Sequence, residues 1–177
     1  MRLVRSATIA AACLSATMAA ADPRPPELIG LIDAERPIGS VDVSLLFFDL
    51  YRANMWTPGD RPFDWSAPFA LSLTYERSFS AEDLASSSID EIARIARADE
   101  ASFAALEAPL KACFADVDEG DRITGVSLSP DQGRFFVNAR KSCDIVYPDF
   151  SRLFFGIWMD PRSRDPEAAE ILRGAAS

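Results

Sequence analysis

The alternating run FALSLTY, which begins at Phe69, constrains the fold of this chain more than any other feature. Phe69, Leu71 and Leu73 alternate with small or polar residues, which is the period of a strand that buries one face. The same row of positions continues through Tyr75 to Arg77. We therefore expect a strand that continues to Arg77 and whose buried face ends in a phenol and a guanidinium.

The rest of the chain alternates between strand and helix patterns. A branched and aromatic stretch over 41–56 favours a strand pair or one bent strand. Ser80 in SAED is typical of a helix N-cap, and Asp165 before Pro166 is typical of another. The further expected elements are a helix over 99–115 interrupted at Pro109, a hairpin made by ITGVSLS and GRFFVNA, and a helix in YPDFSRLFFGIW. This order predicts the α+β class with an antiparallel sheet.

The first 21 residues have the pattern of a cleaved signal peptide. Arg2 and Arg5 precede a short apolar run, and AAA at 19–21 supplies small residues for cleavage. The run is too short for a membrane span, so we expect a periplasmic or secreted protein without membrane contact after cleavage. Residues 22–36 form a proline-rich lead that we expect to be extended and mobile, and 37–174 form one domain.

Two cysteines remain once Cys13 leaves with the signal peptide. In an oxidising compartment Cys113 and Cys143 are candidates for a disulfide. Such a bond would close a loop of roughly 30 residues, which the chain-entropy model values at roughly 3–4 kcal/mol. Two separately buried thiols are the alternative, and sequence spacing leaves both open.

Composition excludes several kinds of chemistry. The chain has no histidine, which removes histidine-based triads and, with two lone cysteines, the usual zinc sites. It has no glycine-rich phosphate loop. A net charge of −9 argues against nucleic acid as a partner. We therefore expect no cofactor, no metal and no nucleic acid.

Polar residues in strand rows that should face inward are the remaining candidates for a ligand site. A buried arginine needs an acceptor because its charge cannot be given up. That acceptor is either an internal carboxylate such as Asp49 or the carboxylate of a ligand. The candidate ligand-binding residues are Tyr51, Tyr75, Arg77, Arg134 and Asn138.

Three ordered blocks carry a resemblance to a known family. FALSLTYERSFSAEDLASSSIDEI, DRITGV and LFFGIWMDPRS resemble the bacterial, exported branch of the chalcone isomerase-like family, and the similarity covers Pro37 to Gly174. The resemblance implies an α+β fold with a curved antiparallel β-sheet covered by helices on one face, often called an open-faced β-sandwich. It also implies a ligand cleft between sheet and helices.

The resemblance implies two activities, and the residues favour one of them. Plant members cyclise chalcones without a cofactor, whereas other members bind fatty acids and anchor the carboxylate with an Arg and a Tyr. The plant catalytic tyrosine matches Phe79 here, and the plant asparagine matches Ser86 or Ser87. Phenylalanine cannot polarise a ketone oxygen in the transition state, so the sequence predicts no catalytic residues.

Three functions therefore remain as hypotheses. The first is a non-catalytic binder of a small amphipathic carboxylate, in which Arg77 pairs with the carboxylate and Tyr75 donates a hydrogen bond. The second is a cofactor-free isomerase or intramolecular lyase for enone-type substrates, with Arg77 as electrophile and Tyr75 as proton donor. The third is a structural or interaction module whose cleft is filled by its own side chains.

Overall fold

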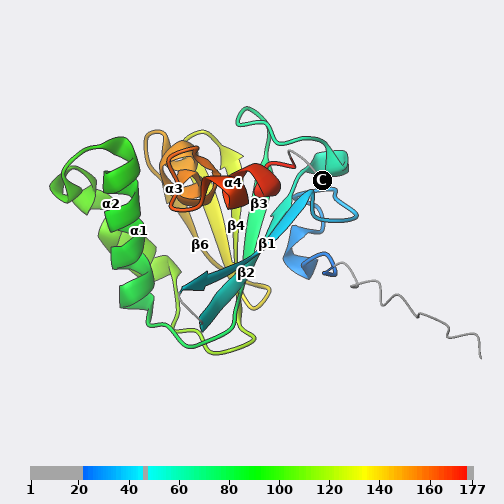
Figure 1. Ribbon diagram of the computed structural model, residues 1–177, viewed down its shortest axis with the longest axis horizontal. Helices are drawn as coiled ribbons and strands as arrows, with labels where there is room; N and C mark the ends of the chain where they lie inside the picture. The colour runs from blue at the N-terminus through cyan, green and yellow to red at the C-terminus, as the bar shows by residue number, and fades with distance from the viewer. Residues whose placement is uncertain (1–21, 46–47, 175–177) are drawn as a thin grey trace, which may run out of the picture.

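A computed structural model of the chain describes residues 22–45 and 48–174 (Figure 1). The predicted signal peptide lies outside the described residues. Within those residues, no helix combines the length and the apolar character needed to cross a bilayer.

Six strands form one antiparallel sheet in the order of the sequence, β1-β2-β3-β4-β5-β6. The strands are β1 (Gly39–Leu45), β2 (Phe48–Trp56), β3 (Phe69–Tyr75), β4 (Arg122–Ser129), β5 (Gln132–Val137) and β6 (Arg140–Val146). The helices are α1 (Ala81–Ala96), α2 (Ala104–Cys113), α3 (Phe150–Met159) and α4 (Pro166–Leu172), with 3₁₀ turns η1 (Pro26–Leu28), η2 (Pro58–Asp60) and η3 (Glu100–Phe103). The predicted α+β class with an antiparallel sheet is confirmed.

Both predicted N-caps are present. The Ser80 hydroxyl accepts a hydrogen bond from the Asp83 backbone N–H at 3.1 Å and donates to its carboxylate at 2.6 Å. The Asp165 carboxylate accepts from the Ala168 N–H at 2.9 Å. These contacts satisfy backbone donors that the first turn of a helix leaves free. They fix where α1 and α4 begin.

Two strand predictions need correction. Strand β3 ends at Tyr75, so Arg77 lies beyond the sheet and not in its inward row. Strand β6 has no counterpart among the sequence predictions, because four of its residues, Arg140, Lys141, Ser142 and Asp144, are exposed polar residues of an edge strand.

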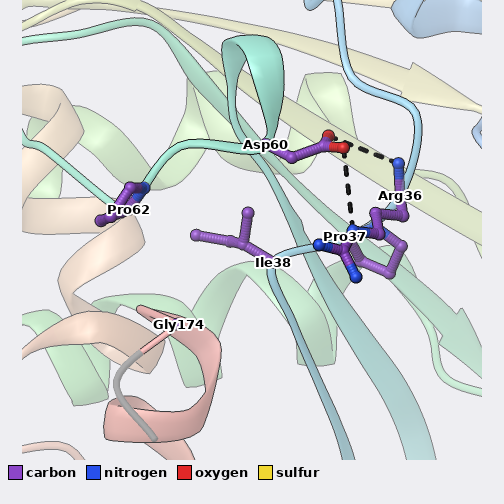
Figure 2. Close-up of a pocket in the computed structure, with 6 residues that line it drawn as sticks. All are labelled: Arg36, Pro37, Ile38, Asp60, Pro62 and Gly174. Atoms are coloured by element: carbon purple, nitrogen blue, oxygen red, sulfur yellow. Dashed lines mark hydrogen bonds and ion pairs between the residues drawn. The ribbon is translucent and has the colours of Figure 1, made fainter.

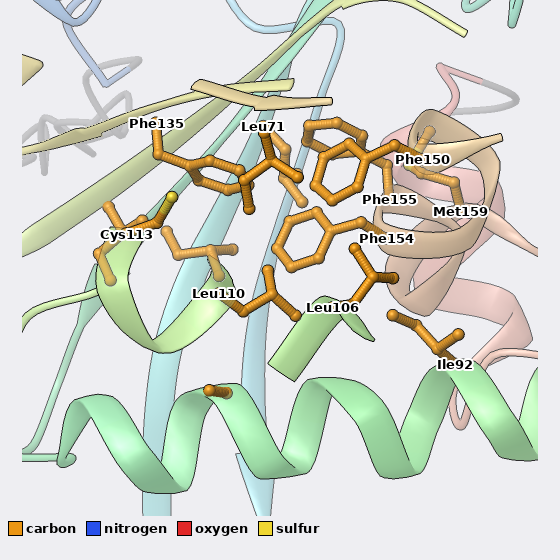
Figure 3. Close-up of a cluster of buried hydrophobic side chains, with 14 of the residues drawn as sticks. Leu71, Ile92, Leu106, Leu110, Cys113, Phe135, Phe150, Phe154, Phe155 and Met159 are labelled. Carbon is orange, nitrogen blue, oxygen red and sulfur yellow. The ribbon is translucent and has the colours of Figure 1, made fainter. Parts of the chain in front are cut away.

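The interface between the sheet and its helices is filled by aromatic rings (Figure 3). Phe135 of β5 meets Phe150 and Phe154 of α3 at ring-centroid distances of 6.1 and 5.1 Å. At Gly133, an added Cβ would overlap the Phe150 ring, so the absence of a side chain lets α3 approach the sheet closely. The middle of this interface therefore has little room for a ligand.

Part of the opposite face of the sheet is covered by the proline-rich lead, which corrects the prediction that 22–36 is extended and mobile. Leu28 and Ile32 are fully buried in a second apolar cluster that includes Trp56, Val126 and Phe136. Figure 1 shows this segment on the other side of the strands from α1 and α2. The lead is therefore an integral layer of the fold.

A buried ion pair fastens this layer to β4. The Glu27 carboxylate, whose side chain is fully buried, accepts from the Arg122 guanidinium through two hydrogen bonds of 3.1 Å and from the Thr124 hydroxyl at 2.6 Å. Burial by itself would raise the pKa of Glu27, but the hydrogen bonds from Arg122 and Thr124 outweigh burial and lower the pKa below its usual value. Glu27 is therefore ionised at neutral pH.

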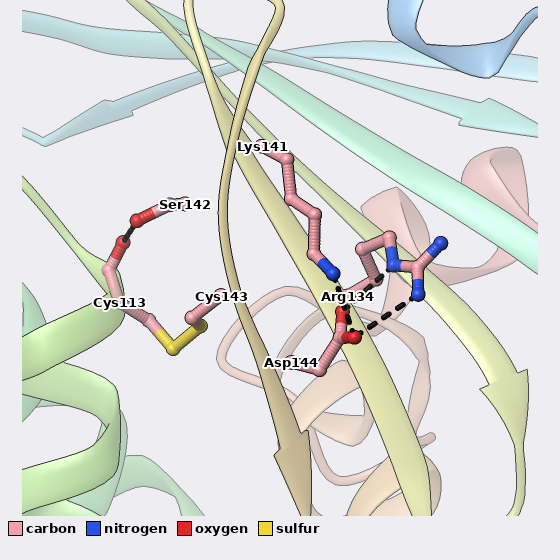
Figure 4. The surroundings of a disulfide bond; sticks show 6 residues. All are labelled: Cys113, Arg134, Lys141, Ser142, Cys143 and Asp144. Carbon is pink, nitrogen blue, oxygen red and sulfur yellow. Dashed lines mark hydrogen bonds and ion pairs between the residues drawn. A yellow bond between two sulfur atoms is a disulfide. The ribbon is translucent and has the colours of Figure 1, made fainter.

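A disulfide joins Cys113 at the end of α2 to Cys143 on the edge strand β6, with the two Cα atoms 5.3 Å apart (Figure 4). The Ser142 hydroxyl also donates to the Cys113 carbonyl at 2.6 Å. These two contacts hold the helical insertion between β3 and β4 against the far edge of the sheet.

Candidate ligand-binding site

Two tyrosines share one rung of the sheet on the side that faces the helices. Tyr51 of β2 pairs with Tyr75 of β3 in the strand register. Their rings meet edge to face, with centroids 6.0 Å apart. The rung lies at the end of β3, at the rim of the helix–sheet interface, where Tyr75 is a buried member of the main apolar cluster and Tyr51 packs against that cluster and is partly buried.

Tyr51 is held from the helix layer by Trp158 of α3. The indole Nε1–H of Trp158 donates to the Tyr51 Oη at 3.0 Å. Burial raises the pKa of Tyr51, the indole hydrogen bond opposes this rise, and the negative charge of Glu91 on α1 adds to it. Tyr51 is therefore a neutral phenol at physiological pH.

Tyr75 is the more deeply buried phenol, with 4% of its surface exposed. Burial raises the pKa of Tyr75 far above its ordinary value, and the neighbouring Tyr51 adds to the rise. Its ring packs on Phe79 at a centroid distance of 5.6 Å. Its hydroxyl makes no hydrogen bond to any side chain or backbone group within the described part of the chain. No buried side-chain nitrogen or oxygen of the described residues lacks a partner, so the Tyr75 hydroxyl touches solvent and is open to a hydrogen bond from outside the chain.

Arg77 is exposed just beyond the Tyr51–Tyr75 rung. It makes no ion pair with Asp49, the internal carboxylate that the sequence suggested as its partner. Its guanidinium carbon lies 4.7 Å from the centre of the Phe48 ring. Asp49 instead accepts a hydrogen bond from the Ser44 hydroxyl at 2.7 Å. A guanidinium on an aromatic face keeps its outer N–H groups free to pair with an anion. Arg77 is therefore placed at the rim, not inside a cleft.

The structure separates Arg134 and Asn138 from this rung. Arg134 donates to both Asp144 oxygens, at 2.7 and 3.0 Å, on the sheet face away from the helices. The hydrogen bonds from Arg134 lead the effects that lower the pKa of Asp144 to about 2. Asn138 sits in the exposed β5–β6 turn at φ 47°, where its side chain accepts from the Arg122 N–H. Their expected inward orientation is wrong, because β5 turns Phe135 towards the helices and Arg134 away, while Asn138 lies in the turn beyond the end of β5.

Two hollows in the described surface are lined by none of the predicted site residues. One of about 190 Å³ lies where Asp60 faces Arg36, close to Gly174 (Figure 2). The other, of about 260 Å³, lies between α1 and the η3–α2 segment, and acidic side chains border it. Within the described residues, no three potential metal ligands of the histidine, cysteine, aspartate or glutamate type come together.

Sequence reasoning missed the helix-layer partners of the tyrosines. Glu91 of α1 accepts from Arg94 at 2.8 and 3.0 Å and from Arg164 of the α3–α4 loop at 2.7 Å. These two arginines lower the pKa of Glu91 against the opposing effect of burial, so its charge near Tyr51 is permanent at neutral pH. The sequence indicates Trp158 only as an aromatic residue near the C-terminal end of an amphipathic helix, and such a residue is also typical of simple packing.

Comparison with solved structures identifies the architecture. The fatty-acid binding protein AtFAP1 of Arabidopsis thaliana aligns with 80% of this chain and 88% of its own, at a TM-score of 0.62 and 10% sequence identity. This chain has the chalcone isomerase-like fold. The predicted open sheet with helices on one face is thereby confirmed. No protein-family model and no curated protein matches the sequence.

Within the chalcone isomerase-like fold, the residue that the resemblance aligned with the plant catalytic tyrosine is a packing residue. Phe79 forms an isolated bridge with Val117 through backbone hydrogen bonds of 2.9 Å in both directions. Its ring lies against Tyr75 and has no hydroxyl to offer. On the helix-facing side of the sheet, phenolic groups are supplied instead by Tyr51 of β2 and Tyr75 of β3.

Proposed function

We propose that this protein binds a small amphipathic carboxylate, with the carboxylate held between Tyr51 and Tyr75. The observation that carries the proposal is the rung itself, where the buried Tyr75 and the partly buried Tyr51 meet edge to face on the helix side of the sheet. The structurally similar plant protein AtFAP1 is a fatty-acid binding protein, which supports a ligand of this class.

The protonated phenols of Tyr51 and Tyr75 suit a carboxylate. Both phenols have raised pKa values, so both keep their protons at neutral and mildly alkaline pH. A carboxylate accepts hydrogen bonds only, and hydrogen bonds between neutral donors and an ionised acceptor are stronger than neutral pairs. Phenolates would repel the same ligand, so the raised pKa values extend the pH range of binding upward.

Arg77 and the rim supply the remaining contacts in this proposal. The guanidinium of Arg77 on Phe48 attracts the anion as it approaches, and the exposure of Arg77 to water keeps that contribution modest. Phe79, Leu84 and Ile157 are partly buried members of the main apolar cluster and offer the alkyl chain a surface. The ligand lies at the rim because aromatic side chains already fill the middle of the interface.

Replacing Tyr75 by phenylalanine should weaken dodecanoate binding about tenfold, since one hydrogen bond to a charged acceptor is lost. Arg77→Gln should weaken it by a smaller factor, about two- to fivefold, and the effect should fade in high salt. Isothermal titration of each purified variant provides the measurement.

Arg152→Gln is the matched control for Arg77→Gln. Arg152 also lies on an aromatic face, with its guanidinium carbon 5.1 Å from the centre of the Trp65 ring, but at a different place in the fold. We expect its affinity for dodecanoate to equal that of the wild type. Equal affinities in the wild type and Tyr75→Phe would refute the proposed position of the carboxylate.

The filled interface is the one observation that favours a second function, an interaction module without a small ligand. Phe135, Phe154 and Phe155 occupy the place that a long ligand chain would need. Native mass spectrometry of freshly purified protein separates the two functions. Co-purified lipid, released on denaturation, supports the binder, whereas a clean protein that also ignores added dodecanoate supports the module.

We further propose that the protein is exported, because the sequence of residues 1–21 fits a signal peptide and Cys113 and Cys143 form a disulfide. Expression of the full chain in a bacterium with a periplasm should yield a product beginning near Asp22. Intact-mass and N-terminal analysis of the periplasmic fraction provides the measurement. A full-length product confined to the cytoplasm would contradict export.

A further inference from the structure

A row of polar side chains crosses the face of the sheet that carries the proline-rich lead. The strand register places four residues side by side in this row, which are Ser40 of β1, Asn54 of β2, Ser72 of β3 and Thr124 of β4. Asn54, Ser72 and Thr124 are buried, with at most 3% of their surface exposed. Buried polar groups of this kind need hydrogen-bond partners, because each one left unpaired costs free energy. We call these four residues the polar row.

The first residues of the lead supply partners to the polar row through their carboxylates. The Asn54 Nδ2 group donates to the Asp22 carboxylate at 2.9 Å, and the Thr124 hydroxyl donates to the Glu27 carboxylate at 2.6 Å. Arg52 of β2 brings its guanidinium to 3.8 Å from the Asp22 carboxylate. Among the described residues, the Asn54 amide nitrogen has no hydrogen-bond partner other than Asp22. The side chain of Asp22 is therefore part of the folded domain.

The polar row and the processing pattern of the sequence meet at Asp22. The small residues AAA at 19–21 allow a signal peptidase to cut directly after Ala21. Removal of Asp22 itself would leave the buried Asn54 amide without its acceptor. Asp22 is thus the first residue that the cleavage pattern leaves in place and also a residue whose side chain the fold uses.

We propose that the bond between Ala21 and Asp22 is the processing site of the exported chain, and that Asp22 then anchors the new N-terminus on the polar row. In the cleavage step, water adds to the Ala21 carbonyl carbon and the peptide bond breaks, which leaves a carboxylate on Ala21 and an amine on Asp22. The signal peptidase of the exporting cell catalyses this hydrolysis. The inference rests on the proposed export and adds the site of cleavage and the place where the new end binds.

An anchored N-terminus should resist further trimming. Asp22 is followed by Pro23, so a dipeptidyl peptidase that removes X–Pro dipeptides is a direct probe of this end. The peptidase must take the N-terminus into its own active site, so Asp22 has to leave Asn54 first, and the cleavage rate follows the population of that open form. We expect wild-type protein to lose the dipeptide at least about tenfold more slowly than a free peptide of residues 22–31.

Two variants test the anchor from its two sides. Asn54→Ala removes the donor, and the loss of a hydrogen bond to a charged acceptor should lower the protection relative to the free peptide by about tenfold. Asp22→Asn leaves the core untouched, keeps an oxygen acceptor and loses the charge, so it should lower the protection by a smaller factor. Each variant is compared with a peptide of its own sequence, which removes any preference of the peptidase for the residue itself.

Asp33→Ala is the matched control for these variants. Asp33 lies in the same lead, but its side chain is fully exposed and lies 3.9 Å from Arg24 rather than on the polar row. It should keep the wild-type protection. Hydrogen exchange in β3 and β4 shows whether Asn54→Ala has loosened the whole sheet, and in that case Asp22→Asn decides the test.

The outcomes separate this inference from the proposed export. The full chain is expressed in a bacterium with a periplasm, and N-terminal analysis reads the first residue of the periplasmic product. A chain that is never processed refutes export and the inference together. A processed chain that begins at another residue leaves export standing and refutes the proposed site. A chain that begins at Asp22 but is trimmed as fast as the free peptide, or as fast in the wild type as in both variants, refutes the anchor. A start at Asp22 with protection that falls in both variants and persists in Asp33→Ala supports the whole inference.

Discussion

Reduction of the Cys113–Cys143 disulfide should lower the free energy of unfolding by about 3–4 kcal/mol, the value that the chain-entropy model gives for a loop of this length. The two residues are 30 positions apart, and the loop they close contains β4, β5 and the turn that returns the chain from α2. Oxidation restricts the unfolded chain and so favours the folded one. Urea unfolding with and without a phosphine reductant provides the measurement.

The Cys113→Ala/Cys143→Ala double variant is the control for this experiment. Its stability should lie near or below that of the reduced wild type and should not respond to the reductant, because no disulfide is present. Cys113 is also a buried core residue, so part of the loss in the double variant comes from packing. Identical unfolding midpoints of oxidised and reduced wild type would contradict a stabilising bond.

Glu27→Gln should lower stability by about 2–3 kcal/mol at neutral pH. The substitution keeps the shape of the side chain but leaves Arg122 without its counter-charge at a site where the Glu27 side chain is fully buried. The Arg122 side chain is 27% exposed, so water relieves part of the cost and the effect falls short of a completely buried pair. Hydrogen exchange over 22–38 should rise more than exchange elsewhere, because this pair fastens the lead to β4.

Glu35→Gln is the matched control, an exposed glutamate in the same segment, and it should leave stability unchanged. The pH dependence provides a second test. The pKa of Glu27 is lower in the folded protein than in the unfolded chain, so its contribution is fully present above the unfolded pKa and is lost as pH falls through the folded value. The difference between wild type and Glu27→Gln should therefore shrink on acidification below about pH 4.5. A stability difference that does not change with pH would mean that packing, and not the charge of Glu27, causes the loss of stability.

Local sequence patterns predicted the helices and strands better than they predicted what packs against each of them. The alternation in FALSLTY placed Phe69, Leu71 and Tyr75 on the face that meets the helices, although the expected exposure of the other face is wrong, because Ala70 and Ser72 are buried too. The cap residues Ser80 and Asp165 fixed two helix starts. These features depend on interactions within a few residues of the chain. They can be inferred from a sequence because no distant partner decides them.

Features that depend on distant partners were missed. The proline-rich lead is ordered because Leu28 and Ile32 cover apolar side chains on the second face of the sheet, which alternation in any single strand does not reveal. The orientation of Arg134 depends on which face of β5 the helices cover. The contact between Trp158 and Tyr51 joins residues 107 positions apart, and no local pattern indicates it.

The proposed function depends on a carboxylate that lies between Tyr51 and Tyr75. The NMR signal of the carboxyl carbon of a bound ligand reports directly on this position. Dodecanoate labelled with ¹³C at the carboxyl group should give one protein-bound resonance with wild-type protein, with nuclear Overhauser contacts to the rings of both tyrosines. The Tyr51→Phe/Tyr75→Phe double variant should lose or strongly weaken that resonance. A bound resonance that persists unchanged in the double variant, or that contacts other residues, would place the carboxylate elsewhere and contradict the proposed site.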